Sequence, residues 1–168
     1  MPVLSRLGLL PATAVQQWHN GLIAYDQVGD IWVLDPVTQG HRILIGGAAN
    51  DAEPDWSPDG TRIMFWRDNG SSDHGLMVAN ADGTDQIQVS TDSADTHVWS
   101  PDGTRIAMDN NLADGWSVWV AQADGSGARQ LQLGMQADNP AWHPDGRHLL
   151  FRGYTDAHVL GLYTVDVD

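Results

Sequence analysis

A turn motif that returns at a fixed interval constrains this chain more than any other feature. Residues 56–60 and 99–103 read WSPDG, residues 142–146 read WHPDG, and the three tryptophans that open them are 43 residues apart both times. Residues 18–21 read WHNG, which we count as a shortened fourth copy. Internal similarity at a period of roughly 20 to 50 residues is typical of repeat architectures.

Short apolar runs follow each copy of the turn. They are rich in β-branched and aromatic residues and are bounded by Gly, Pro, Asp or Asn, which is typical of strands. The runs are 22–25, 63–66, 106–108 and 149–151, then 31–34, 76–79, 118–121 and 162–165, then 43–45, 87–89 and 131–133. With the strand that ends at the tryptophan, each copy predicts four short antiparallel strands, which we name A to D.

Four-stranded units of this length with Trp and Asp-Gly signatures predict the blades of a β-propeller, an all-β fold. Runs that are apolar throughout fit sheets covered on both faces, as a blade between two blades is. A meandering β-sandwich is the alternative. We expect a single domain over residues 1–168, and its four blades are predicted at 14–50, 51–93, 94–136 and 137–168.

The last copy contains strands A to C only, and the N-terminus offers a fourth strand. Leu7 precedes Trp18 by 11 residues, as Leu131 precedes Trp142. Residues 3–10 are therefore predicted to be a closing strand D, which would remove a free sheet edge.

This strand could complete the last blade of its own chain, giving a four-bladed ring. It could instead complete the last blade of a second chain, giving an eight-bladed homodimer. We favour the homodimer, because large side chains such as Trp66 and Trp119 suit a gentle angle between blades. A secretory signal over residues 1–14 is the competing interpretation, but Arg6 interrupts its apolar stretch.

The repeated residues also resemble a known family. Residues 54–63 (PDWSPDGTRI) and 79–83 (ANADG) are similar to the TolB-type, WD40-like propeller repeat. The match recurs at 98–106 with 121–125, and at 140–149. The resemblance implies a propeller fold in rings that usually have six or more blades, and a periplasmic or extracytoplasmic location. It implies no single activity, because the repeat occurs in scaffold proteins and in lids of serine peptidases.

The charge of the chain excludes some partners. Asp and Glu number 22 against 8 Lys and Arg, which gives a net charge of −14. So acidic a chain is repelled by nucleic acid phosphates and by anionic membrane surfaces, so we expect neither as a partner. The absence of cysteine excludes disulfides, zinc–thiolate sites and thiol nucleophiles.

Candidate binding residues lie where the copies differ. In a propeller the B–C and D–A loops share one face, and variable loops of this kind tend to carry binding sites. On this variable face the candidates are Asp73, His74, Asp114, Trp116, Tyr154, Asp156 and His158. Residues just before the tryptophan of strand A should reach the central channel, and the candidates at its mouth are Glu53, His97 and Asn139. The carboxylates of Asp95 and Asp138 could hold a hard cation such as calcium, or could simply be solvated.

These features favour a non-enzymatic binding or scaffold module that uses the variable face and the channel mouth to bind a protein or a small ligand. The chain has no Gly-x-Ser-x-Gly elbow and no His-x-x-x-His pair. A metal-dependent hydrolase or lyase with its site in the channel is the first alternative. An engineered or excised propeller fragment without a cellular function is the second.

Overall fold

The structure is a computed structural model that describes residues 21–70, 75–91, 94–112, 115–154 and 160–168. These residues form four antiparallel sheets, which we number in chain order. The first sheet contains β1 (Ile23–Gln27), β2 (Asp30–Leu34) and β3 (His41–Ile45). The second contains β4 (Asn50–Trp56), β5 (Arg62–Asp68), β6 (Gly75–Asn80) and β7 (Ile87–Gln88). The third contains β8 (Ala94–Trp99), β9 (Arg105–Leu112), β10 (Gly115–Gln122) and β11 (Arg129–Gln130), and the fourth β12 (Gln136–Trp142), β13 (His148–Tyr154) and β14 (Leu160–Asp166).

The observed sheets confirm the predicted all-β class with antiparallel units of three and four strands. Strands follow one another in sequence order within each sheet, so the second and third sheets have the predicted order A to D. The predicted closing strand at 3–10 and the predicted strand A of the first copy lie outside the described residues. The described residues contain no helix long and apolar enough to cross a membrane.

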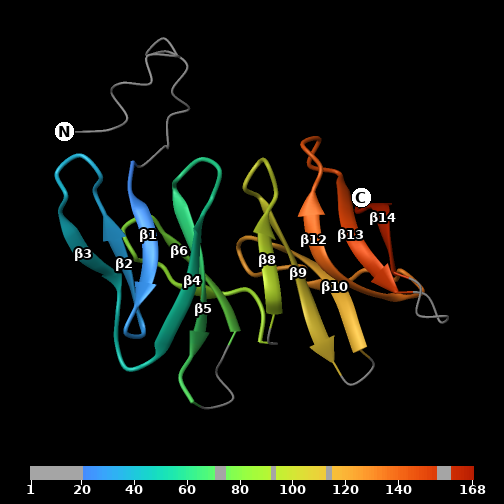
Figure 1. Cartoon of the computed structure of the whole chain (residues 1–168), viewed down its shortest axis with the longest axis horizontal. Helices are drawn as coiled ribbons and strands as arrows, with labels where there is room; N and C mark the ends of the chain where they lie inside the picture. Colours follow the sequence, from blue (N-terminus) through green and yellow to red (C-terminus); the bar gives the residue numbers. More distant parts are fainter. Residues whose placement is uncertain (1–20, 71–74, 92–93, 113–114, 155–159) are drawn as a thin grey trace, which may run out of the picture.

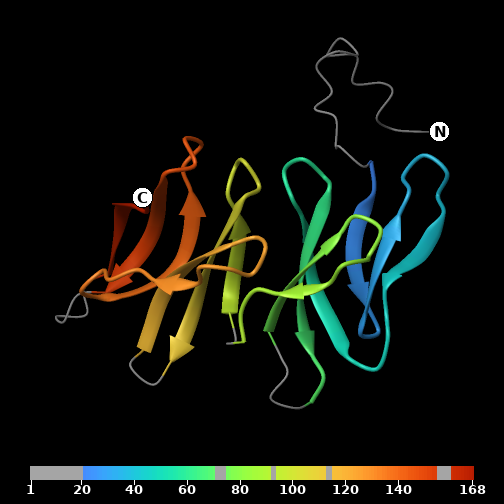
Figure 2. The ribbon, with the colours of Figure 1, turned by 180° about the vertical axis from the view of Figure 1, so that it is seen from behind.

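The four sheets stand in a row, with the first and the fourth at opposite ends (Figure 1). The view from behind shows the same order (Figure 2). Each gap between neighbouring sheets is filled by an apolar cluster. Ile31 of the first sheet packs with Phe65 of the second, Met64 of the second with Met108 of the third, and Ala107 of the third with residues of the fourth. A middle sheet thus buries both faces, which explains why its strands are apolar throughout.

The repeated turn holds itself together through its serine. Ser57 Oγ donates to Asp59 Oδ1 at 2.6 Å and accepts from the Arg62 amide at 3.0 Å. This hydrogen bond from Ser57 is the main reason that the pKa of Asp59 lies below its ordinary value. Ser100 makes the same two bonds in the next copy. The repeat of Ser, Asp and Gly in these turns is therefore structural.

The tryptophan and arginine of the motif join one sheet to the next. Arg62 Nη2 donates to the Gly103 carbonyl at 2.5 Å, and its guanidinium lies 5.3 Å from the centre of the Trp99 ring. In return Trp99 Nε1 donates to the carbonyl of Asp55 at 3.2 Å. Arg105 and Trp142 repeat this arrangement between the third and fourth sheets. The fixed spacing of Trp, Arg and Gly thus encodes the contact between blades.

The first strand of the first copy begins one residue later than the predicted apolar run. Ala24 pairs with Val33, as Met64 pairs with Val78 in the second sheet. The apolar run of the first copy therefore begins at Ile23, one residue later than the predicted 22–25.

Candidate functional site

The first strand of the second, third and fourth sheets each contains a bulge. These bulges lie where the sequence predicts the channel mouth. The register shifts between Ala52 and Asp55 in β4, between Ala94 and His97 in β8, and between Asp138 and Ala141 in β12. Glu53 and Asn139 sit in these bulges with φ of 54° and 50°, a left-handed conformation that is uncommon outside glycine. Bulges redirect side chains, and both of these side chains are exposed.

A buried carboxylate links two of these bulges. Asp109 in β9 is buried, and its two oxygens accept the amides of Thr96 and Asn139, each at 2.8 Å. His97 Nε2 lies 3.3 Å from the Glu53 carbonyl oxygen, so the structure brings these two predicted residues together. The sequence analysis missed Asp109. The available signal was a polar residue directly after the apolar run 106–108, at a position where the second copy has Trp66 and the fourth has Arg152.

The predicted metal ligand Asp138 is engaged by an arginine. Arg152 Nε and Nη2 contact its two carboxylate oxygens, both at 2.6 Å, and the Tyr154 hydroxyl donates to Oδ2 at 3.3 Å. Burial raises the pKa of Asp138, but the hydrogen bonds from Arg152, Asn139 and Tyr154 and the charge of Arg152 together outweigh it, so the pKa lies below its ordinary value. This geometry does not favour calcium at Asp138. Asp95 lies in β8, and its side chain is outside the described part of the structure.

Within the described ranges, no group of three or more His, Asp or Glu side chains is placed to hold a metal ion. Two of the candidates on the variable face can be located. Trp116 pairs with Asn111 at the end of the β9–β10 hairpin, and Tyr154 lies in the fourth sheet beside Asp138. The remaining candidates lie outside the described residues, and they are Asp73, His74, Asp114, Asp156 and His158.

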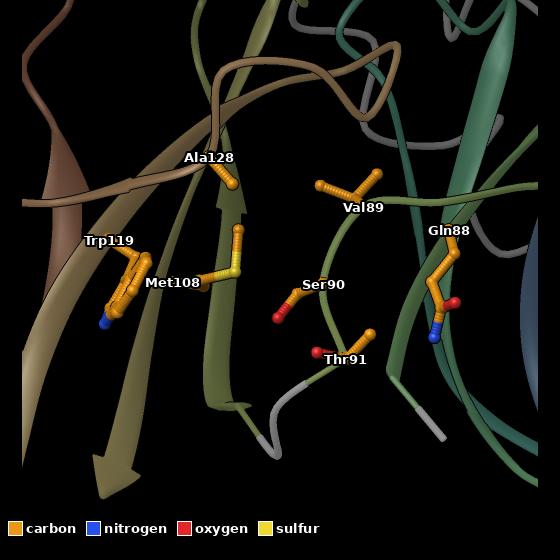
Figure 3. Close-up of a pocket in the computed structure, with 7 residues that line it drawn as sticks. All are labelled: Gln88, Val89, Ser90, Thr91, Met108, Trp119 and Ala128. Carbon is orange, nitrogen blue, oxygen red and sulfur yellow. The ribbon is translucent and has the colours of Figure 1, made fainter. Parts of the chain in front are cut away.

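A cleft of about 280 Å³ opens between the second and third sheets. Its lining residues are Gln88, Val89, Ser90, Thr91, Met108, Trp119 and Ala128. The hydroxyl groups of Ser90 and Thr91 point toward the side where Met108 and Trp119 lie (Figure 3). Ser90 and Thr91 belong to the connection from strand D to strand A, one of the two predicted variable loops. Met108 and Trp119 are strand residues, which the sequence analysis assigned to packing alone.

Two contacts fix the shape of this cleft. Trp119 Nε1 donates to Ser117 Oγ at 3.0 Å, which orients the indole ring. Gly75 lies against the opposite wall with a φ of 153°, and a Cβ there would come within 1.8 Å of the Ser90 carbonyl oxygen. Glycine at this position therefore allows residues 88–91 to pass close to β6.

Comparison with known proteins identifies the family to which the repeat belongs. Residues 22–168 match the family model described as the TolB beta propeller domain. The chain belongs to the TolB β-propeller family. This finding confirms the resemblance that the sequence motifs indicated.

Two curated relatives share part of this TolB-type propeller. The Tol-Pal system protein TolB of Anaeromyxobacter dehalogenans is 31% identical over 102 residues, which is 60% of this chain and 24% of that protein. The uncharacterized peptidase YuxL of Bacillus subtilis is 28% identical over 92 residues, which is 53% of this chain and 14% of that protein. The chain thus spans less than a quarter of the length of either relative.

The crystal structure of TolB from Acinetobacter baumannii shares the fold. Its TM-score is 0.65 at 15% identity, and the match covers 88% of this chain and 38% of that one. At this level of identity the likeness concerns the fold alone.

Proposed function

We propose that this TolB-type propeller is a binding module whose small-ligand site is the cleft between the second and third sheets. The observation that carries the proposal is the composition of the cleft. The Trp119 ring and the Met108 thioether lie on one side, and the hydroxyls of Ser90 and Thr91 on the other. Small-molecule sites are typically concave and mainly apolar, with a few placed polar groups.

The lining suggests the class of ligand. An indole ring and a thioether favour contact with a flat apolar surface or an aromatic ring. The Thr91 hydroxyl can donate to and accept from hydroxyl or amide groups of a ligand. A volume of about 280 Å³ suits a small molecule. The net charge of −14 favours neutral or cationic ligands over anionic ones.

Protein binding through the variable face is the wider form of this proposal. That face carries Trp116 and Tyr154, which are half-buried, and aromatic residues are enriched in the centres of protein interfaces.

Fragment binding followed by NMR tests the small-ligand site. The chain would be titrated with a panel of neutral hexoses, nucleosides and aromatic amines at millimolar concentration. We expect at least one class to shift the indole N–H signal of Trp119 and the amide signals of Val89 and Thr91. The indole signal of Trp142, which lies between the third and fourth sheets, should stay in place.

A matched pair of variants provides the control. Thr91→Val removes a hydroxyl from the cleft while keeping the shape of the side chain, and should weaken binding of the shifted compound by about tenfold. Thr38→Val makes the same change at an exposed turn of the first sheet and should leave binding unchanged. The proposal is refuted if no compound moves the Trp119 signal, or if both variants bind alike.

A further inference from the structure

The fourth sheet exposes leucines on its outer face at positions that are buried elsewhere. Leu162 of β14 is 74% exposed, whereas Leu76 and Val118, its equivalents in the second and third sheets, are fully buried against the following sheet. Leu150 of β13 is 41% exposed on the same face. The equivalents of Leu150, which the strand register identifies as Met64 and Ala107, are also fully buried.

The first sheet shows the converse on its own outer face. Ile23 of β1 is 52% exposed. Its equivalents in the other three sheets are fully buried against the preceding sheet, and they are Ile63, Ile106 and Leu149. Tyr25 and Trp32, which pair with each other, lie on the same face as Ile23. In the other three sheets, the equivalent face packs against the preceding sheet. The outer face of the first sheet therefore has the side chains of such a contact but no preceding sheet among the described residues.

The indole N–H of Trp32, on this face, lacks a hydrogen-bond acceptor. Its Nε1 atom is buried and has no hydrogen-bond partner. At the equivalent position in the third sheet, Trp119 Nε1 donates to Ser117 Oγ. A buried indole N–H without an acceptor is costly, and native proteins usually satisfy it.

We propose that the outer face of the fourth sheet docks against the outer face of the first sheet of a second copy of this chain. The two faces are complementary because they are the two halves of the interface that the molecule already makes three times between its own sheets. Leu150 and Leu162 of one copy would be buried against Ile23 and its neighbours in the other.

The same logic sets the symmetry of the assembly. The described sheets of one chain present one exposed face of each kind, so the proposed contact is head to tail, and two copies bury both pairs of these faces only by closing a ring. The ring would contain eight sheets, with the bulges at Glu53 and Asn139 of both copies around its centre. Because each chain has a net charge of −14, salt should strengthen the association by screening repulsion between the copies.

Native mass spectrometry and light scattering of the chain test this dimer. We expect a particle of twice the 18.3 kDa mass of one chain, and a dimer that is tighter at about 0.5 M than at about 0.05 M salt. Leu162→Asp and Ile23→Asp each place a charge in the proposed interface and should weaken dimerisation by about 100-fold or more. Val28→Asp and Val37→Asp, at exposed loop positions away from both faces, should leave it unchanged.

Mixing the two damaged chains distinguishes a head-to-tail ring from any other dimer. In a mixed pair, Leu162→Asp and Ile23→Asp meet at one contact, and the second contact consists of two intact faces. We therefore expect a heterodimer from the mixture under conditions where each variant alone is monomeric. Circular dichroism would confirm that both variants fold. A monomeric wild-type chain, a dimer that Leu162→Asp leaves intact, or a mixture that stays monomeric would each overturn the proposal.

Discussion

Asp109 provides the sharpest test of how the third and fourth sheets are held together. Its carboxylate is buried, and its two oxygens accept backbone amides from two different sheets, Thr96 in β8 and Asn139 in β12. Asp109→Asn keeps one oxygen acceptor and turns an NH₂ group toward the other amide. At least one charge-assisted hydrogen bond is then lost, and two donors face each other.

The expected loss of stability follows from these two contacts. A hydrogen bond to a charged group contributes about 1.5–3 kcal/mol, and an unsatisfied buried donor costs about 1–3 kcal/mol. Asp109→Asn should therefore lower the free energy of unfolding by about 3 kcal/mol. For a chain of this length that corresponds to a decrease in Tm of about 6–12 °C. Asp109→Ala leaves both amides unsatisfied and should cost more.

Urea unfolding, followed by tryptophan fluorescence, measures this loss. Asp68→Asn is the matched control, because Asp68 is exposed and accepts the amide of Gly70 inside its own turn. It should change stability by less than about 0.5 kcal/mol. Amide exchange of Thr96 and Asn139 should accelerate in Asp109→Asn. Equal unfolding curves for Asp109→Asn and Asp68→Asn would refute the proposed role of the carboxylate.

Three further predictions concern the contacts between sheets. Arg105→Met removes a donor to the next sheet and should cost about 1–3 kcal/mol in urea unfolding, whereas Arg42→Met at an exposed position should cost less than about 0.5. Gly83→Ala places a Cβ 2.5 Å from the Leu44 carbonyl oxygen of the first sheet and should lower Tm more than Gly70→Ala, where φ is also positive but nothing lies within 4 Å. Because folding lowers the pKa of Asp138, its contribution to stability is complete at neutral pH and is lost as pH falls below about 4. Asp138→Asn should remove that part of the acid dependence of urea unfolding.

The architecture could be predicted because the repeated residues are the ones that make its contacts. The serine and aspartate close each turn locally, so their spacing in the sequence maps directly onto a hairpin. The arginine of one copy bonds to the glycine of the next, as Arg62 does to Gly103. Glycines of the C–D turns likewise pass close to the preceding sheet, as Gly125 does to the Gln88 carbonyl. Because each copy makes the same contact with the next, the residues that make it recur in the sequence at a fixed interval.

The candidate site was less predictable because it depends on how far apart two sheets stand. Met108 and Trp119 have apolar equivalents in every copy, so nothing in the sequence separates a residue that lines a cleft from one that packs. The first strand of the first copy also differs by one residue from the predicted run 22–25, because it begins at Ile23. Its pairing, with Ala24 opposite Val33, is set by the hydrogen bonds between β1 and β2, which a run of apolar residues does not show.

The two interfaces made by the third sheet show how departures from the repeat relate to function. Toward the fourth sheet, Asp109 bridges the backbones of β8 and β12. At the equivalent position of the second sheet stands Trp66, which packs with Trp119 against the apolar cluster between the second and third sheets. The interface with a carboxylate at this position has its backbones joined, and the interface with an indole contains the cleft. In these two interfaces of the third sheet, Asp in place of Trp at one repeat position accompanies joined backbones, and Trp accompanies the cleft.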